Sequence, residues 1–130
     1  QEPNEKHDER FTYIKGDFLT EKKAIKDIDL IVCNPPFNGA PSRKLFPELF
    51  LKKILSLYPN TPIVLITPIG LIFNQRHKSK RWQDMKNIKI NFELINPLDI
   101  FSTTEKDTLI HTHNLFINFN EYQSIYYIEE

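Results

Sequence analysis

Apolar and polar positions follow different periods along the chain, and each period predicts a different element. Residues 29–33 (DLIVC) and 62–67 (PIVLIT) are continuous apolar runs that end at prolines, as expected of strands buried on both faces of a parallel sheet. Between them, apolar residues recur at three- and four-residue steps from Arg43 to Tyr58, which predicts an amphipathic helix closed by Pro59-Asn60. The order strand, helix, strand predicts a right-handed parallel crossover.

The remaining elements are shorter. Residues 11–15 read as a strand stopped by Gly16-Asp17, residues 20–28 as a brief helix or turn, residues 75–90 as a loop with a short helix, and residues 92–95 as a strand. Residues 108–119 and 124–128 are β-rich, and we expect them to pair as an antiparallel hairpin. The predicted fold class is therefore α/β, a mostly parallel sheet with an antiparallel C-terminal hairpin.

Composition limits the architecture more than the function. A chain of 130 residues that is 40% hydrophobic suits one compact domain or a piece of one, and we expect residues 1–10 to be a flexible polar lead before a domain at 11–130. Seventeen basic residues balance seventeen acidic ones, so contact with nucleic acid would need a local patch. The single cysteine, Cys33, favours a reducing, cytoplasmic compartment, and no apolar run predicts a membrane span.

The most informative segment is Asn34-Pro35-Pro36-Phe37, directly after the first apolar run. Two prolines fix two φ angles and remove two backbone donors, so a strand must end there. Each residue before a proline is also pushed toward extended backbone. The prediction is a stiff segment beyond the carboxyl end of a strand, where open α/β sheets bind ligands, with carbonyls available as acceptors.

This arrangement suits chemistry on an amino group conjugated to a ring. Such an amine is a poor nucleophile, because its lone pair is delocalised. The Asn34 side-chain oxygen and the Pro35 carbonyl could accept both N–H bonds and direct the lone pair at an electrophilic methyl group. Phe37 would offer a π face to a base lifted from its stack. The plain structural alternative is a proline-terminated strand with Asn as a turn former and Phe as a core residue.

Residues 29–37 resemble motif IV of the amino-methyltransferases with a Rossmann-like fold, whose consensus is Asp/Asn/Ser-Pro-Pro-Tyr/Phe/Trp after a hydrophobic strand. Residues 16–19 (GDFL) resemble the preceding acidic motif, which implies that Asp17 and Phe18 contact the adenine part of S-adenosylmethionine. Residues 62–68 resemble the next strand, and residues 113–119 a late strand that often supplies a second aromatic, here Phe119. The resemblance implies methyl transfer from S-adenosylmethionine to adenine N6 in DNA.

The sequence departs from this family at the glycine-rich cofactor loop, which should precede Gly16. The only glycines are Gly16, Gly39 and Gly70, and they form no cluster. We therefore expect either a fragment of a longer methyltransferase, which we favour, or a degenerate protein kept as a non-catalytic binding module. On the fragment reading, the isolated chain binds the cofactor poorly, and a second chain or the missing N-terminal portion covers the sheet edge. Methylation of guanine N2 in RNA or of a protein glutamine remains an alternative within the same chemistry.

One dense basic cluster follows the second apolar run, and its cations and tryptophan suit phosphate contact and base stacking. Its residues are Arg76, Lys78, Lys80, Arg81 and Trp82, followed by Lys86 and Lys89. A solvated loop and helix with Trp82 in the core is the structural alternative. His111 and His113 alternate along a strand, but without a third ligand we interpret them as ordinary polar positions and expect no metal site.

Overall fold

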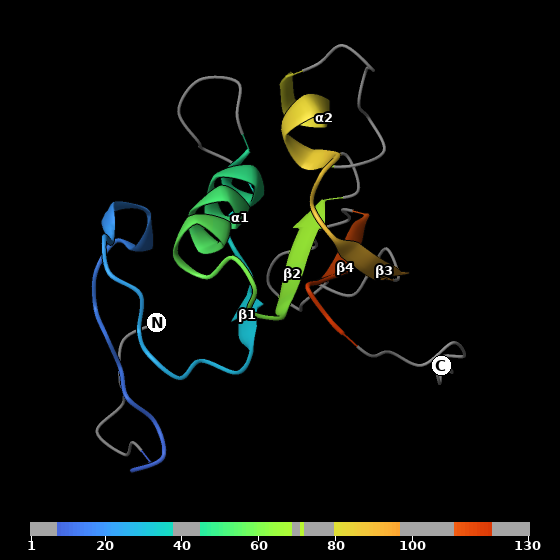
Figure 1. Cartoon of the computed structure of the whole chain (residues 1–130). Coiled ribbons are helices and arrows are strands. Elements are labelled where there is room, and N and C mark those ends of the chain that lie inside the picture. The colour runs from blue at the N-terminus through green and yellow to red at the C-terminus, as the bar shows by residue number, and fades with distance from the viewer. Residues whose placement is uncertain (1–7, 38–44, 69–70, 72–79, 97–110, 121–130) are drawn as a thin grey trace.

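The computed structural model of the chain describes residues 8–37, 45–68, 71, 80–96 and 111–120. Within them the strands form one sheet in the order β1-β2-β4-β3, with two α-helices beside it (Figure 1). The elements in chain order are a 3-10 turn η1 (Phe18–Thr20), β1 (Ile31–Cys33), α1 (Phe46–Leu57), β2 (Ile63–Pro68), α2 (Lys80–Met85), β3 (Ile90–Ile95) and β4 (Thr112–Ile117).

The direction of the strands decides which residues share an edge of the sheet. β1 pairs with β2 in parallel, whereas β4 is antiparallel to both β2 and β3. Therefore β1, β2 and β3 run in one direction and β4 runs in the other. The carboxyl ends of β1, β2 and β3 thus meet at one edge, together with the start of β4. This confirms an α/β chain and the predicted parallel pairing across a strand, helix, strand unit. With one parallel and two antiparallel pairings, however, the described sheet is mixed and not mostly parallel.

Helix α1 forms where the three- and four-residue spacing predicts it. Pro47 lies in its first turn, where a missing N–H costs no helical hydrogen bond, and Glu48 adds an acidic charge near the N-terminus. At the other end, the Tyr58 N–H donates to the Ile54 carbonyl at 2.7 Å before Pro59 ends the helix. Among the described residues, no helix is long and apolar enough to cross a membrane.

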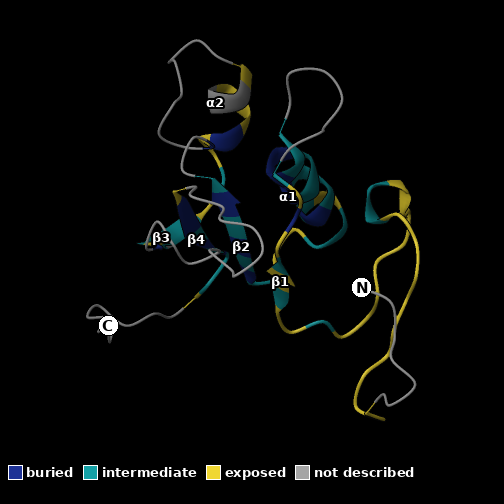
Figure 2. Cartoon of the chain, turned by 180° about the vertical axis from the view of Figure 1, so that it is seen from behind, coloured by how far each residue is buried: buried dark blue, intermediate teal, exposed yellow. Residues whose placement is uncertain are grey.

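The core lies between one face of the sheet and the helices. Cross-strand pairs Ile63–Ile117 and Leu65–Leu115 put four fully buried side chains on this face. They join Leu51, Ile54, Leu71 and Met85 in a single apolar cluster. Figure 2 shows the buried positions on β2, β4 and α1, and an exposed N-terminal segment. On the opposite face, Val64, Ile66 and Phe116 are only half-buried.

The C-terminal antiparallel pairing has other partners than the sequence predicts. Residues 112–117 pair with β2 on one side and with β3 on the other. Both edges of this segment are therefore occupied, and residues 124–128 have no free edge there on which to form the expected hairpin. Residues 121–130 themselves lie outside the described part of the chain. The prediction that β4 is antiparallel is confirmed, but its hairpin partner is wrong.

The N-terminal half of the predicted sheet is less regular than expected. Residues 11–15 are extended but form no strand, and they leave Phe11 70% and Ile14 67% exposed. β1 is an outer strand of the described sheet rather than one buried on both faces, since Val32 is 69% exposed. Within the described residues, the 11–15 segment pairs with no strand, and β1 pairs with β2 on one edge only and packs Ile31 and Cys33, but not Val32, against the core. Residues 20–28 contain only the end of η1 and bends.

Candidate functional site

The Asn34-Pro35-Pro36-Phe37 segment leaves the sheet at the carboxyl end of β1, as the two prolines require. Pro35 is buried and Phe37 is half-buried, whereas Asn34 and Pro36 are exposed. The buried ring anchors the corner, and the exposed amide stands beyond it. Among the hydrogen bonds between described residues, none engages the Asn34 side chain or the Pro35 carbonyl. The polar acceptors of this segment are therefore available to a ligand, although residues 34–37 line neither of the two described pockets.

Cys33 lies immediately before Asn34, and its environment can be tested by chemistry. Burial raises the pKa of its thiol from the usual 9.0 to about 11. The thiolate is the reactive form, so at pH 9 the folded chain should hold about fiftyfold less of it than the denatured chain.

We therefore predict that iodoacetamide alkylates Cys33 about fiftyfold more slowly in folded than in denatured protein at pH 9, as followed by mass spectrometry. The sequence has a single cysteine, so the adduct is unambiguous. The same burial stabilises the folded state below pH 9, and this contribution is lost as pH rises through about 11. Equal rates in folded and denatured protein at pH 9 would show that the strand end is open to solvent.

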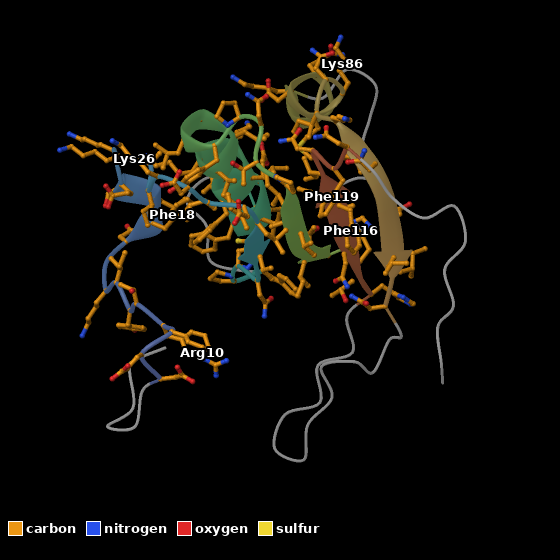
Figure 3. All side chains as sticks on the ribbon, turned by 60° about the horizontal axis from the view of Figure 1, so that its bottom comes forward. Arg10, Phe18, Lys26, Lys86, Phe116 and Phe119 are labelled. Carbon is orange, nitrogen blue, oxygen red and sulfur yellow. The ribbon has the colours of Figure 1, made fainter. Side chains whose placement is uncertain are left out.

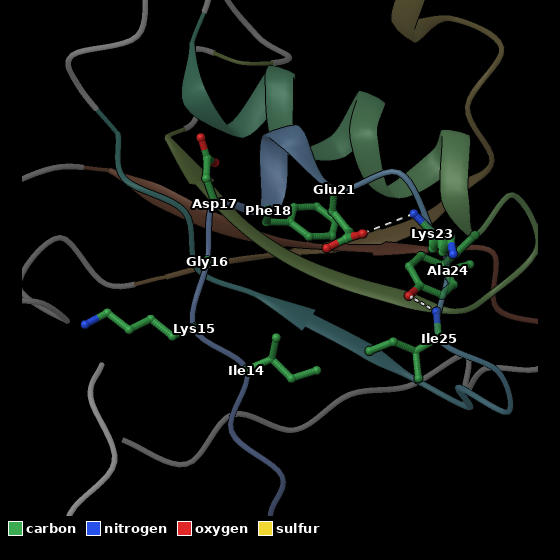
Figure 4. Close-up of a pocket in the computed structure, with 10 residues that line it drawn as sticks. Ile14, Lys15, Gly16, Asp17, Phe18, Glu21, Lys23, Ala24 and Ile25 are labelled. Atoms are coloured by element: carbon green, nitrogen blue, oxygen red, sulfur yellow. Dashed lines mark hydrogen bonds between the residues drawn. The ribbon is translucent and has the colours of Figure 1, made fainter.

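A pocket of about 380 Å³ surrounds the second predicted motif (Figure 4). Asp17 caps η1 by accepting a hydrogen bond from the Leu19 N–H at 3.0 Å, and its side chain is exposed. Phe18 stacks on Phe50 of α1 with ring centroids 5.8 Å apart. The lining residues are Ile14, Lys15, Gly16, Asp17, Phe18, Glu21, Lys23, Ala24, Ile25 and Tyr58. The structure thus places both predicted cofactor residues on one pocket with carboxylates, lysines and aromatic surface.

Most members of this pocket were not predicted as site residues from the sequence, and Tyr58 and Glu21 are two of them. The Tyr58 hydroxyl accepts a hydrogen bond from the Ile25 N–H at 2.8 Å, which ties the 14–25 segment to the end of α1. The backbone N–H groups of Lys23 and Lys22 donate to Glu21 and lower the pKa of its carboxyl. Tyr58 lies 33 positions from Ile25, so no local pattern could reveal the contact.

The structure shows only part of the predicted basic cluster. Arg76 and Lys78 lie outside the described residues, as do the side chains of Arg81 and Trp82. Lys80 begins α2 and is exposed, and Lys86 follows the helix and points outward (Figure 3). The two alternatives for Trp82, stacking or core, therefore both stay predictions.

A bridging lysine connects α2 to α1. Lys52 Nζ donates to Asp84 Oδ2 at 2.8 Å and to Glu48 Oε1 at 3.1 Å. The hydrogen bond with Asp84 raises the pKa of Lys52. Together with the buried side chain of Met85, this bridge holds α2 beside the core. Lys80 is the first residue of this helix.

Phe119 does not lie near Asn34. Because β4 runs antiparallel, Ile117 pairs with Ile63 at the amino end of β2, so Phe119 follows at the opposite edge of the sheet. There it packs on Phe116 with ring centroids 5.7 Å apart (Figure 3), and its backbone N–H donates to Asn91 Oδ1 at 2.7 Å. The structure thus places Phe119 away from Asn34 and against Phe116, so it does not bring these two predicted site residues together.

Polar side chains that the sequence analysis did not assign to the site gather at the same edge as Asn34. His113 is fully buried beside Thr67, and its Nδ1 lies 2.8 Å from Glu93 Oε2. On the other face, Asn96 Nδ2 donates to both Thr112 Oγ1 and Asn114 Oδ1 at 3.1 Å. The signal in the sequence is the run Thr112-His113-Asn114 inside an otherwise apolar strand. His111 is exposed and outside β4, and the described residues contain no group of three potential metal ligands.

Comparisons with known proteins agree with the fold and give no family. No family model and no curated protein matches the sequence. The fold is similar to part of a solved structure described as "Structural basis underlying complex assembly and conformational transition of the type I R-M system", with a TM-score of 0.56 and 18% sequence identity. The match covers 78% of this chain and 22% of that chain. The chain therefore has the fold of a segment that makes up about a fifth of a chain in a restriction-modification structure.

Proposed function

We propose that this chain forms the target-base half of an S-adenosylmethionine-dependent methyltransferase that acts on adenine N6 in DNA. The observation that carries the proposal is the exposed, uncommitted Asn34 amide at the carboxyl end of β1, held by buried Pro35. The sheet supports this proposal, because the carboxyl ends of β1, β2 and β3 lie at the same edge as Asn34. In α/β proteins, ligands bind at this edge of the sheet. The fold similarity to a type I restriction-modification structure supports the same class.

In this function the chain's residues orient the amine. Asn34 Oδ1 and the Pro35 carbonyl accept the two N–H bonds of the exocyclic amino group and turn its lone pair out of the ring plane. Phe37 contacts the face of the flipped base. S-adenosylmethionine, when bound, would supply the methyl group as an electrophile, and the amine would release one proton to solvent on accepting it.

The pocket beside η1 fits the adenosine part of S-adenosylmethionine, which would supply the electrophilic methyl group. Asp17 offers an exposed carboxylate to a polar edge or hydroxyl, and Phe18 with Tyr58 offers apolar surface. Lys15 and Lys23 add cations at the rim. The methionine part has no glycine-rich loop in these 130 residues, so we propose that another polypeptide segment completes its site.

That segment also has a place to dock. The outer edge of β1 is unpaired within the described sheet, and Val32 and Leu30 beside it are 69% and 50% exposed. Exposed apolar edges invite strand pairing unless they are covered. We propose that a second chain, or further sequence of the same protein, covers this edge in the active, cytoplasmic enzyme.

The reaction can be tested by product identification. Full-length protein should transfer isotopically labelled methyl groups from S-adenosylmethionine to adenine-containing DNA, and nuclease digestion with mass spectrometry should give N6-methyladenine. RNA and a glutamine-containing peptide are parallel substrates, because the same amine chemistry acts on guanine N2 and on a side-chain amide. If the label appears in guanine N2 or in glutamine and not in adenine, then RNA or protein, and not DNA adenine, is the substrate. No transfer to any of the three would favour the non-catalytic module, which the absent glycine loop supports.

A further inference from the structure

A row of three residues crosses the sheet at its carboxyl edge, from Asn34 to β4. Cys33 pairs with Leu65, so the next residue, Asn34, stands level with Ile66 when the register is continued. Ile66 in turn pairs with Asn114 of β4. A carboxamide, an aliphatic side chain and a second carboxamide therefore follow one another over two strand spacings, about 10 Å. Asn34 is exposed, and Ile66 and Asn114 are half-buried, so ligands can reach the row.

Asn114 is oriented by the buried amide of Asn96. Asn96 is 9% exposed, and its Nδ2 donates to Asn114 Oδ1 at 3.1 Å and to Thr112 Oγ1 at 3.1 Å. Its backbone N–H donates to the Thr112 carbonyl at 2.9 Å, which fixes the Asn96 side chain beside β4. The Asn114 oxygen is thereby engaged, and its Nδ2 group is turned away from Asn96. No hydrogen bond between described residues uses that Nδ2 group.

Asn114 is half-buried, so its Nδ2 group can donate to water or, in its place, to the acceptor of a ligand. The neighbours of Asn114 on its face of the sheet include Ile66 and Phe116, which provide no acceptor in their side chains. A carboxamide that is held in place by a second, buried carboxamide is preorganised to donate to a ligand.

We propose that Asn114 determines specificity for the target base: its Nδ2 donates to a ring nitrogen of the purine whose exocyclic amine is held by Asn34. Ile66, between the two amides, is the apolar surface that the ring lies against. This inference rests on the proposed function and extends it from the amino group to the ring. It follows that the preferred substrate is an amine on a ring with an unprotonated nitrogen, as in adenine. A glutamine side chain lacks such a nitrogen and would form no equivalent hydrogen bond with Asn114.

Binding experiments with base analogues test the roles of Asn34 and Asn114 separately. Fluorescence anisotropy at low salt measures binding of the full chain to a labelled single-stranded oligodeoxyadenylate. Matched oligonucleotides carry 1-deazaadenine, 7-deazaadenine, or purine without the amino group. Wild-type protein should bind one of the two deaza oligonucleotides about two- to tenfold more weakly than the adenine oligonucleotide. Asn114→Ala should bind the adenine oligonucleotide more weakly by a similar factor and no longer distinguish it from that deaza analogue.

Two further variants control for folding and charge. Asn114→Asp keeps an oxygen for Asn96 but removes the donor, so it should lose the same discrimination even if Asn114→Ala folds poorly. Asn60→Asp adds an equal charge at an exposed turn before β2, at the opposite edge, and should keep the wild-type preference. Discrimination that survives in both Asn114 variants, or is lacking in wild-type protein, would overturn the inference.

The amino-free purine tests the proposed function separately. Asn34→Ala should lose the preference for adenine over purine without the amino group, whereas Asn114→Ala should keep it. If Asn34→Ala retains that preference, the role of Asn34 fails, whatever the deaza analogues show. If the wild-type chain does not bind the adenine oligonucleotide, both proposals are overturned.

Discussion

Replacing Asn34 with alanine is expected to lower the rate of DNA methylation at least about a hundredfold while leaving the fold intact. The alanine removes the side-chain acceptor that turns the amine lone pair toward the methyl group. It removes no packing, because Asn34 is exposed and its side chain makes no hydrogen bond with the described residues. Initial rates of labelled methyl transfer in full-length protein measure the effect, and urea denaturation measures stability.

Asn34→Asp and Asn60→Ala sharpen this experiment. Aspartate keeps an acceptor oxygen at the same reach, so this variant should retain more activity than the alanine variant. Asn60 is also an exposed asparagine, at the opposite edge of the sheet, and its replacement by alanine should leave the rate unchanged. Wild-type turnover in Asn34→Ala would refute the role of the amide and, with it, the proposed mechanism.

Elements that local pattern determines were predictable from the sequence. The α1 periodicity gives residues 46–57 within the predicted 43–58, because one apolar stripe faces one core. β2 is apolar except for Thr67 and lies between two other strands, so its continuous run was correctly interpreted as a strand. β1 has the same pattern but is an outer strand in the described sheet. An apolar run alone does not distinguish a central strand from an outer one, and Val32 of β1 is 69% exposed.

Pairing partners depend on tertiary structure and could not be predicted locally. β4 was correctly expected to be antiparallel, yet it inserts between β2 and β3 instead of forming a hairpin with later residues. The insertion reverses which end of β4 lies near Asn34. It moves Phe119 to the far edge and brings Thr112 and Asn114 to the near one. An error in pairing alone thus exchanges one set of candidate site residues for another.

The candidate site also combines features that the local sequence predicts with contacts that only the tertiary structure creates. The diproline corner follows from backbone restrictions on four consecutive residues, so its position at a strand end was predictable. The pocket beside Asp17 depends on Tyr58, and the Asn96–Asn114 pair joins residues 18 positions apart. Buried polar residues such as His113 are also hard to anticipate, because their burial is tolerated only where a partner such as Glu93 meets them.

Leu65→Ala is expected to cost about 2–5 kcal/mol of unfolding free energy, the largest stability effect among the substitutions considered. Leu65 is fully buried in β2, where it pairs with Leu115 of β4 and with Cys33 of β1. It belongs to the apolar cluster that includes Leu51 and Ile54 of α1. Truncation removes apolar contacts from both the sheet and the helix, and the strands on each side restrict how far the site can collapse. Urea denaturation monitored by circular dichroism gives the change.

Val32→Ala is the matched control, because Val32 lies on neighbouring β1 but is 69% exposed. It should cost under about 1 kcal/mol in the isolated chain. The comparison tests which face of the sheet is the core, since Leu65 points to the α1 side and Val32 to the other. If a covering segment binds the exposed face, the cost of Val32→Ala should rise in its presence while that of Leu65→Ala stays the same. A small cost for Leu65→Ala would contradict a single core between the sheet and α1.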